Sequence, residues 1–394
     1  MIIRPKIRGF ICTTAHPVGC SQQVQTQIDY VKKCPPIAPG PKKALVIGAS
    51  TGYGLSSRVV AAFGCRAATI GIFFERPSEN KRTATAGWYN AIAFEKKARA
   101  EGLYAKSFNA DAFCDEIKER VAEAVRKDLG QLDLIIYSVA SPRRVHPKTG
   151  SVDKSVLKPI GASYTNKSLD FDTNRVVQVS LPAATEEEVH QTVSVMGGED
   201  WEMWMDSLDR GDLIAEGALS VAYSYVGPEV TYPVYRGGTI GKAKDHLEQT
   251  ARKLTERLKK KNAKALISIN KALVTQSSSA IPFIPLYFVI LRKVMKQKGL
   301  DEDCIQQMVR LFSSRLYAKS EIPVDSHGRI RIDDLEVRPD VQEEVMRLWE
   351  IVTTENLPEI ADLKGYREDF LKLFGFGFPE VDYNQDVDPD LQLS

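Results

Sequence analysis

The stretch that decides the fold is KKALVIGASTGYGLSSRVVAAFGC, residues 42–65. It opens with a short apolar run, which is typical of a buried strand, and it ends with apolar side chains at helical spacing. Gly48, Gly52 and Gly54 lie between the two. A strand that passes through a glycine-rich turn into a helix is the first unit of an alternating α/β fold, so the flanking sequence must show whether the alternation continues.

The alternation does continue on the C-terminal side. Apolar strand-like runs at 67–75, 104–111 and 132–140 are separated by helical patterns at 88–101 and 113–130. Strands that are so uniformly apolar are buried on both faces, as in a parallel sheet between two layers of helices. The sequence therefore predicts an α/β fold with a Rossmann-like, doubly wound parallel sheet.

The pattern breaks after residue 140. Residues from about 141 to 217 are typical of an insertion with a short hairpin and one or two helices, and strands then return at 218–227 and 263–270. We expect a single dinucleotide-binding domain over 1–394. Its parts are an N-terminal strand or hairpin in 1–40, a core in 41–280 that carries the insertion, and a helical extension in 281–394.

Composition excludes several classes of protein. The chain has 394 residues, 43% hydrophobic and 26% charged, with a net charge of +2. This favours an ordered globular protein and predicts neither nucleic-acid binding nor stable membrane insertion. The six cysteines are too few for a disulfide scaffold, and Cys12, His16 and Cys20 lack the fourth ligand of a zinc site, so we expect no metal. We expect a cytoplasmic monomer.

The most apolar stretch is AIPFIPLYFVIL, residues 280–291. It holds two prolines and is well short of the ~20 residues that a membrane-spanning helix needs. Two interpretations stay open for it: a wall of an apolar ligand pocket, or ordinary core.

The glycine turn predicts a dinucleotide site. Gly48 permits the sharp turn, and Gly52 and Gly54 let the backbone approach a pyrophosphate at the start of the helix. Ser50 and Thr51 can bond the phosphates or cap the helix. Glycines in such turns also serve backbone geometry alone, but the surrounding strand–helix–strand pattern favours the nucleotide.

The next strand ends in Glu75, about 20 residues after the last glycine. A carboxylate there can accept hydrogen bonds from both ribose hydroxyls and would repel a 2′-phosphate, which favours NADH over NADPH. The neighbouring Arg76 would offset part of that repulsion, and a solvated acid at a strand end is the alternative. Other strand ends, with Asp111 and Ala112 or Val139 and Ala140, fall at the same edge of the sheet.

A second group of candidates lies in YPVYRGGTIGKAKDH, residues 232–246. On a helical wheel, Lys244 falls about 40° from Ile240, beside the apolar stripe, and Lys242 about 200° away, on the opposite face. A lysine on the buried side needs a reason to be there, so the wheel selects Lys244.

The tyrosine partner is harder to choose. On a continuous helix Tyr235 would point about 220° from Ile240, away from Lys244. Gly237 and Gly238 permit a break, so we predict that Tyr235 lies before the regular helix. Tyr232 and Tyr225 remain alternatives, and all three can simply be packing residues. A tyrosine with a lysine beside a nicotinamide suits reduction, because the hydroxyl can donate to an oxygen that gains negative charge.

At these residues the chain resembles the FabV-class enoyl-acyl-carrier-protein reductases and the related trans-2-enoyl-CoA reductases, which are enlarged relatives of the short-chain dehydrogenases. The similarity runs over essentially the full length. It is carried by segments that include RGFICTTAHPVGC (8–20), GASTGYGLSSR (48–58), AYSYVGPE (222–229), GTIGKAK (238–244) and FLKLFGFG (370–377).

The resemblance implies an NADH-dependent reduction of the C2=C3 double bond of trans-2-enoyl thioesters, carried by coenzyme A or acyl carrier protein, in fatty acid biosynthesis. The family has a tyrosine and a lysine separated by eight residues, which Tyr235 and Lys244 match, with Tyr225 in the substrate site. The implied NADH contacts are Gly48, Ala49, Ser50, Thr51, Gly52, Tyr53, Phe74, Glu75, Asp111, Ala112, Val139, Ala140, Lys244, Leu273, Val274 and Thr275.

Two alternatives remain beside this interpretation. A 3-oxoacyl or alcohol dehydrogenase is disfavoured by the long tyrosine–lysine spacing. A non-catalytic dinucleotide sensor would have no use for a lysine on the buried side of its helix. The segment TYPVYRGG (231–238) departs from the TWP pattern of one branch of the family, so the sequence leaves the preferred acyl carrier open.

Overall fold

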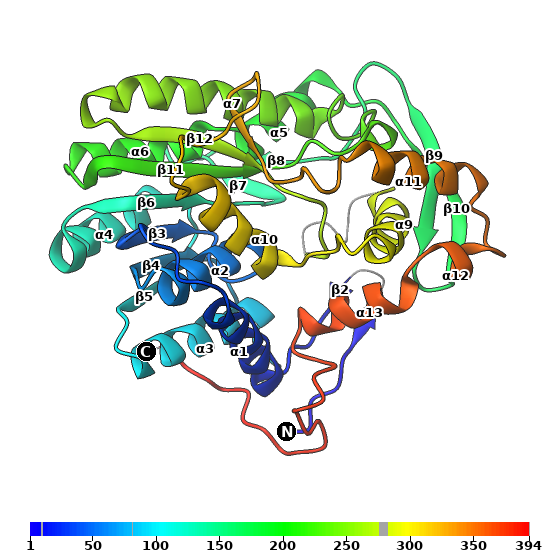
Figure 1. Ribbon diagram of the computed structural model, residues 1–394, viewed down its shortest axis with the longest axis horizontal. Helices are drawn as coiled ribbons and strands as arrows, with labels where there is room; N and C mark the ends of the chain where they lie inside the picture. Colours follow the sequence, from blue (N-terminus) through cyan, green and yellow to red (C-terminus); the bar gives the residue numbers. More distant parts are fainter. Residues whose placement is uncertain (9–10, 81, 276–282, 394) are drawn as a thin grey trace.

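The computed structural model describes residues 1–8, 11–80, 82–275 and 283–393. Within these residues, seven parallel strands form the central sheet (Figure 1). In order across the sheet they are β13 (Arg329–Arg331), β12 (Lys264–Ile269), β11 (Ile214–Ser224), β6 (Leu132–Tyr137), β3 (Lys43–Ile47), β4 (Ala68–Phe73) and β5 (Ala105–Asn109). The predicted parallel Rossmann-like sheet is confirmed.

The central strand β3 shows why helices cover both faces. Ala44 and Val46 pack into one hydrophobic core, and Leu45 and Ile47 pack into the other, because successive side chains point to opposite faces. One core is completed by α1 (Pro17–Lys33), α2 (Gly52–Val59), α3 (Ala86–Ala100) and α10 (Cys304–Leu311), and the other by α4 (Asp115–Ala124), α6 (Glu199–Arg210) and α7 (Thr239–Arg257). The sheet is therefore doubly wound, as predicted. Helices α2, α4 and α10 each run on into a π-helical turn.

The N-terminal segment differs from the expectation of a strand or hairpin over 1–40. Strands β1 (Ile7–Arg8) and β2 (Ile11–Cys12) do pair antiparallel, but α1 follows. Pro17 occupies the first turn of α1, and Nδ1 of His16 accepts a hydrogen bond from the Gly19 amide at 3.1 Å. The helix buries a stripe at helical spacing that the sequence already contained: Cys20, Val24, Ile28 and Val31.

The insertion contains two hairpins where we expected one. The first joins β7 (Arg143–Val145) to β8 (Val152–Lys154), and the second joins β9 (Tyr164–Asp170) to β10 (Arg175–Leu181). The second hairpin stands beside the C-terminal helices at the right of Figure 1. Lys167 anchors it there by donating to the carbonyls of Trp349 and Glu350 at 3.0 and 2.8 Å.

The two helices of the insertion have different roles. Helix α5 (Glu186–Met196) is partly exposed and packs on α7. Helix α6 buries Trp201 and Trp204 completely against the sheet, so it is the crossover between β6 and β11.

The C-terminal region is mostly helical, as expected, with α9 (Ile284–Gln297), α10, α11 (Pro339–Ile351), α12 (Leu357–Ile360) and α13 (Leu363–Lys372). It also supplies β13, the edge strand of the sheet, which the sequence did not predict. Its buried apolar side chains are Ile330 and, just after the strand, Ile332; Arg331 lies between them, so no apolar run reveals the strand. The doubly wound sheet thus extends beyond residue 280.

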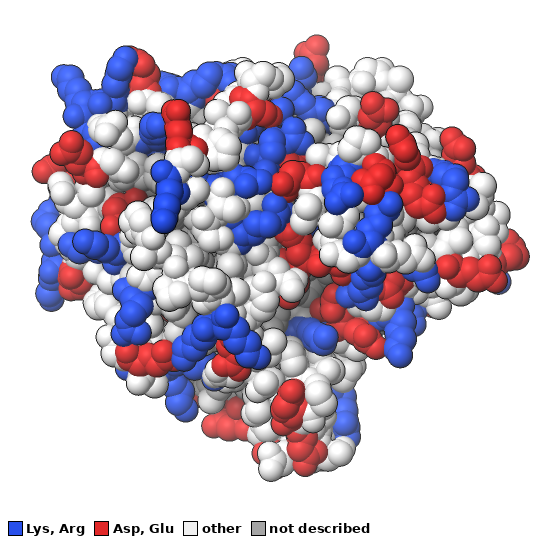
Figure 2. Space-filling model, in the orientation of Figure 1, with Lys and Arg blue, Asp and Glu red and all other residues white. Residues whose placement is uncertain are grey.

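Among the described residues, no helix has both the length and the apolar composition needed to cross a bilayer. Residues 280–282 of the apolar stretch lie outside the described residues, and Ile284–Leu291 form the first half of α9. On the face in Figure 2, lysine and arginine side chains are interspersed with aspartate and glutamate. This mixture agrees with the small net charge of the chain.

Candidate active site

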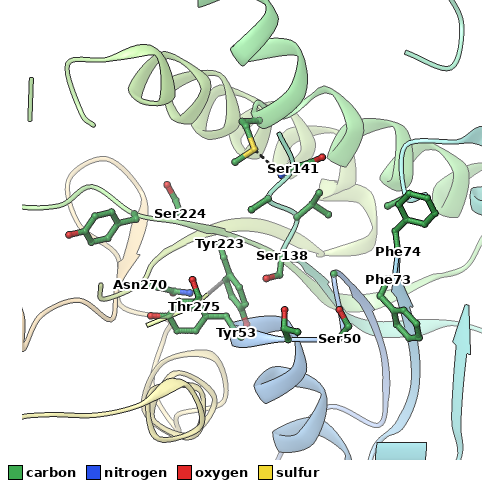
Figure 3. Close-up of a pocket in the computed structure, with 18 of the residues that line it drawn as sticks. Ser50, Tyr53, Phe73, Phe74, Ser138, Ser141, Tyr223, Ser224, Asn270 and Thr275 are labelled. Carbon is green, nitrogen blue, oxygen red and sulfur yellow. Dashed lines mark hydrogen bonds between the residues drawn. The ribbon is translucent and has the colours of Figure 1, made fainter. Parts of the chain in front are cut away.

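A cavity of about 520 Å³ lies at the carboxyl ends of the central strands. Ser50 and Tyr53 border it from the start of α2, and Ser138 and Ser141 from the segment after β6 (Figure 3). Phe74 stands at one side, and Ser224, Asn270 and Thr275 stand at the other. In open α/β sheets this edge is where ligands bind, because the strand order reverses there.

The glycine turn packs tightly against the rest of this edge. Gly48 has φ = +88°, and a Cβ atom on it would lie 2.0 Å from the carbonyl oxygen of Ser138. A Cβ on Gly54 would lie 1.9 Å from the carbonyl oxygen of Gly48. The turn therefore requires glycine at both positions, and it brings the N-terminal end of α2 to the cavity. Thr51 makes no side-chain capping hydrogen bond to α2.

Glu75 is held at the end of β4 by its neighbours. Its Oε1 accepts a hydrogen bond from Ser50 Oγ at 2.7 Å, and its backbone amide and carbonyl bond the side chain of Asn109 at 2.7 and 2.8 Å. Burial raises the pKa of Glu75, against the hydrogen bonds from Thr85 and Ser50, which lower it. Phe74 lies beside it, 75% exposed and at the border of the cavity, so its ring is accessible to a ligand there.

The cavity brings together nearly all of the predicted site residues. Ala49 and Val274 are exceptions, because their side chains are buried in the core and only their backbones are near this edge. The predicted residues that line the cavity are Gly48, Ser50, Thr51, Gly52, Tyr53, Phe74, Glu75, Asp111, Ala112, Val139, Ala140, Tyr225, Tyr235, Lys244, Leu273 and Thr275. Their contacts with a cofactor or substrate stay predictions.

The predicted break before the lysine helix is confirmed. Helix α7 begins at Thr239, and Tyr235 lies in the irregular turns that precede it. Gly238 forms an isolated β-bridge with Pro159, and a Cβ on Gly238 would lie 2.2 Å from the carbonyl oxygen of Val234. The break lets Tyr235 and Lys244 line the same cavity, which a straight helix would not permit.

Lys242 and Lys244 face the sides of α7 that the helical wheel predicts, while the functional role of Lys244 stays a prediction. Lys242 is exposed, and Lys244 is half-buried with its Nζ 3.4 Å from the carbonyl oxygen of Tyr223. Burial lowers the pKa of Lys244 to about 8. Among the described residues, no carboxylate lies within ion-pair distance of this ammonium group. Its positive charge is therefore available to a negatively charged or polar ligand.

The rival tyrosines differ in position. Tyr232 is 39% exposed and does not line the cavity. Tyr225 and Tyr235 both line it, and their rings meet edge to face with centroids 4.9 Å apart. Burial raises the pKa of Tyr235 above its usual range, and the charge of Glu336 adds to the effect. Tyr235 is thus protonated at neutral pH and able to donate.

Several residues of the cavity were not predicted. Ser138 and Asn270 follow β6 and β12, so the rule that ligands meet strand ends would have found them. Met196 comes from the insertion, and its sulfur lies 3.4 Å from the Ser141 amide that donates to it. Nothing in the local sequence marks Met196.

Comparison with known proteins identifies the family of the chain. Residues 82–317 match the family model described as the trans-2-enoyl-CoA reductase catalytic region. Residues 2–80 match the NAD(P)H binding domain of trans-2-enoyl-CoA reductase, and 324–387 match a model described as an enoyl reductase FAD binding domain. The chain belongs to the trans-2-enoyl-CoA reductase family.

Relatives that carry either name of this family have similar identity to the chain. The chain is 59% identical over 393 residues to the enoyl-[acyl-carrier-protein] reductase [NADH] of Opitutus terrae, covering 100% of both chains. It is 56% identical over 393 residues to the trans-2-enoyl-CoA reductase [NADH] of Ruminiclostridium cellulolyticum, covering 100% of this chain and 99% of the relative. The crystal structure of Clostridium acetobutulicum trans-2-enoyl-CoA reductase in complex with NADH superimposes with a TM-score of 0.96 at 43% identity, over 99% of this chain and 98% of that one.

The residues of 324–387 do not fit a flavin site. None of the described residues in that range lines the cavity, and the strand–turn–helix with close-approach glycines belongs to Gly48–Gly54. The range contributes the edge strand β13 and the helices α11, α12 and α13, whose apolar faces pack into the core.

Proposed function

We propose that this protein reduces the C2=C3 double bond of trans-2-enoyl thioesters with NADH, in fatty acid biosynthesis. One observation carries the proposal: the break at Gly238 brings Tyr235 and Lys244 into the cavity that also holds the glycine turn and Glu75. Membership of the enoyl reductase family supports it.

Different residues of the cavity would contact different parts of the dinucleotide. The start of α2 would take the pyrophosphate, Glu75 and Phe74 the adenosine, and Lys244 the nicotinamide ribose. When bound, NADH supplies a hydride to C3 of the enoyl group. The other components of the reaction come from side chains of this protein.

Tyr235 and Lys244 would share the charge that the reaction creates. Negative charge develops on the thioester oxygen as C3 receives the hydride, and the Tyr235 hydroxyl donates a hydrogen bond to that oxygen. Lys244 holds the cofactor and places a positive charge near the same region. C2 of the resulting enolate then takes one proton, supplied in the end by the solvent, so that the enoyl thioester, NADH and H⁺ give the saturated thioester and NAD⁺.

NADH oxidation with crotonyl-CoA tests the function. The expected result is steady turnover, with crotonyl-CoA converted to butyryl-CoA mole for mole with NADH. The Tyr235→Phe, Lys244→Met double variant sets the background. A wild-type rate no higher than that background would contradict the proposal, and turnover of a 3-oxoacyl thioester in its place would favour the dehydrogenase alternative.

The acyl carrier needs its own measurement, since relatives with either name are similarly close. We propose to compare kcat/KM for short and long enoyl-CoA with the matching acyl-carrier-protein thioesters, because only this ratio reports discrimination between them. Ile284 of the apolar stretch lines the cavity, so that stretch contributes to a wall that the acyl chain would meet.

Replacing Glu75 should change the choice of cofactor. The Glu75→Ala variant loses the carboxylate that repels a 2′-phosphate, and Arg76 remains beside it. We expect the ratio of kcat/KM for NADH to that for NADPH to fall about ten- to hundredfold. The exposed Glu79→Ala is the matched control and should keep the wild-type ratio. An unchanged ratio in Glu75→Ala would remove Glu75 from the cofactor site.

A further inference from the structure

Glu336 is a fully buried carboxylate that follows the edge strand β13. Its Oε1 accepts hydrogen bonds from the hydroxyls of Tyr225 at 2.9 Å and Tyr287 at 2.8 Å. Its Oε2 accepts the backbone N–H of Ala272 at 2.7 Å. Three donors thus converge on one side chain that neither the sequence nor the reaction outlined above assigns.

The three donors belong to different parts of the site. Tyr225 follows β11, lines the cavity and packs its ring against that of Tyr235. Ala272 lies in the segment after β12 that lines the cavity with Leu273 and Thr275. Tyr287 belongs to α9, one turn after Ile284, which lines the cavity as well. Glu336 therefore joins the substrate side of the cavity to the cofactor side.

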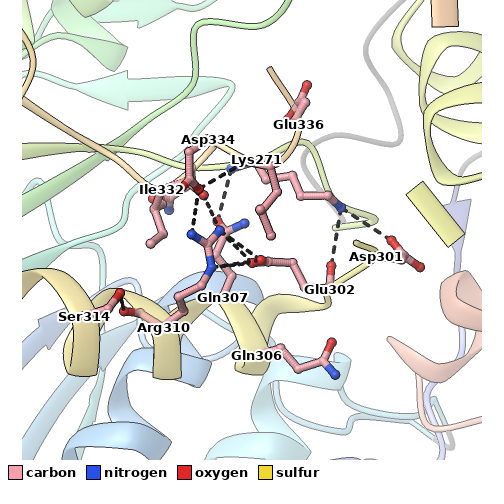
Figure 4. A network of polar contacts seen from close by, with 12 residues as sticks. Lys271, Asp301, Glu302, Gln306, Gln307, Arg310, Ser314, Ile332, Asp334 and Glu336 are labelled. Atoms are coloured by element: carbon pink, nitrogen blue, oxygen red, sulfur yellow. Dashed lines mark hydrogen bonds and ion pairs between the residues drawn. The ribbon is translucent and has the colours of Figure 1, made fainter. Parts of the chain in front are cut away.

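The charge of Glu336 is held by hydrogen bonds. Burial raises its pKa, against the bonds from Ala272 and Tyr287, which lower it. Lys271, the nearest lysine in sequence to its Ala272 partner, turns elsewhere: its Nζ lies 3.6 Å from Asp301 and bonds the carbonyl of Glu302 (Figure 4). Gln342 bonds the Tyr287 hydroxyl at 3.2 Å, which directs the hydroxyl proton toward Glu336.

Lys271 is close enough for its charge to lower the pKa of Glu336, but none of the described residues forms an ion pair with this carboxylate. A buried carboxylate held in this way costs stability, and apolar packing would hold three elements together at lower cost. The advantage of a carboxylate over apolar packing is that its hydrogen bonds are directional, because each lone pair fixes one donor in one orientation. Tyr225 would otherwise be free to rotate its hydroxyl toward solvent in the cavity.

We propose that Glu336 is a positioning residue of the reductase, which holds Tyr225 and the segment that begins at Ala272 in one fixed relation. It acts through these groups and lines no part of the cavity itself. The distance between Tyr225 on the substrate side and the segment from Ala272 on the cofactor side is then fixed by the side chain of Glu336. This inference rests on the proposed function where it is tested by kcat/KM for crotonyl-CoA. The NADH dissociation constant tests it without that assumption.

Glu336→Gln keeps the shape of the side chain and replaces one acceptor oxygen by an amide donor. Whichever way the amide lies, at least one of the three donors loses its partner. We expect kcat/KM for crotonyl-CoA to fall about ten- to hundredfold, mostly through KM, and the NADH dissociation constant to rise several-fold. Calorimetry measures the dissociation constant without turnover.

Asp333→Asn is the matched control. Asp333 is also buried and lies on the same segment, but its carboxylate bonds the guanidinium of Arg331, at 2.6 and 2.8 Å, and not the residues that Glu336 holds. We expect this variant to lower the melting temperature and to keep kcat/KM and the NADH dissociation constant within about twofold of wild type. A purely structural role for Glu336 predicts the same result for Glu336→Gln.

A double-mutant cycle isolates the link to Tyr225. If Glu336 acts through Tyr225, adding Tyr225→Phe to Glu336→Gln should raise KM for crotonyl-CoA no further than the larger single effect. Should Glu336→Gln fail to fold, Tyr287→Phe removes one donor from the same oxygen and is expected to lower kcat/KM about two- to fivefold.

Unchanged kcat/KM and NADH affinity in the foldable variants, or effects of Glu336→Gln and Tyr225→Phe that multiply, would overturn the proposal. Failure of the proposed function gives a different result, namely no turnover by the wild-type protein. The NADH dissociation constants of the variants still decide the positioning role in that case.

Discussion

Tyr235→Phe is expected to lower kcat for crotonyl-CoA about 10²- to 10³-fold, the usual cost of removing one hydrogen-bond donor from a developing oxyanion. The ring and its edge-to-face contact with Tyr225 remain, so the cavity keeps its shape. The loss should appear equally in kcat and kcat/KM, because the donor acts in the transition state and not in the bound ground state. Stopped-flow or steady-state NADH oxidation measures it.

Tyr232→Phe is the matched control for this variant, three residues earlier in the same irregular segment. Tyr232 is 39% exposed and lies outside the cavity, so its variant should keep wild-type kcat. NADH affinity should stay within about twofold of wild type in both variants, since neither hydroxyl is expected to contact the dinucleotide. Full activity in Tyr235→Phe would transfer the donor role to another group.

Lys244→Met should weaken NADH binding by at least about tenfold and lower kcat as well, because it removes the cation that we propose to hold the nicotinamide ribose. In the wild-type protein the same lysine is expected to make NADH binding depend on pH. Its pKa is about 8, so NADH affinity should fall as the pH rises through that value, and the dependence should be absent in Lys244→Met. Titration of NADH binding between pH 7 and 9.5 measures both effects.

The same substitution should make the folded protein more stable at neutral pH. Burial lowers the pKa of Lys244 from its ordinary value, so the folded state binds fewer protons than the unfolded state between about pH 8 and 10.4. The cost of the buried charge is therefore fully present below pH 8 and disappears as the pH rises toward 10.4. We expect Lys244→Met to raise the free energy of unfolding by about 2 kcal/mol at pH 7, after a discount for the partial exposure of the lysine.

Urea denaturation at two pH values measures this stability gain. The gain should be present at pH 7 and shrink by pH 9.5, as far as the wild-type protein remains folded there. Lys242→Met is the control, because Lys242 is exposed on the same helix, and it should change stability at neither pH. A loss of stability in Lys244→Met at pH 7 would contradict the assignment of its buried charge.

The sequence predicted those parts of the site that depend on local periodicity. Helical spacing separated Lys244 from Lys242, and the mismatch between Tyr235 and a straight helix located the break that the structure has before Thr239. Strand alternation likewise predicted the parallel sheet. These features depend on residues within one or two turns of each other, which a wheel or an alternation pattern captures.

The parts that escaped prediction depend on distant contacts. Glu336 meets Tyr225 from 111 positions away in the chain, and nothing around it indicates a role in the site. The strand that precedes Glu336 is three residues long and alternates arginine with isoleucine, so its burial depends on β12 beside it. The helix α1 is a different case, because it depends on local sequence. Val24, Ile28 and Val31 lie at helical spacing and would have predicted it, whereas Cys12, His16 and Cys20 are interpreted only as metal-ligand candidates.

The β-bridge between Pro159 and Gly238 has a consequence for protein engineering. Lys158 also accepts the Thr239 amide at 3.0 Å, so the first loop of the insertion after β8 supports the very turn that aims Tyr235. The turn between β7 and β8 is mostly exposed, so we expect its loss to be tolerated better than loss of the β9–β10 turn, whose Phe171 is buried against Tyr366. A deletion that reaches Lys158 or Pro159 removes the backbone contacts to Gly238 and Thr239 that support the turn before α7, although these residues lie more than 70 positions from Tyr235 in the chain. We expect such a deletion to displace Tyr235, the proposed hydrogen-bond donor.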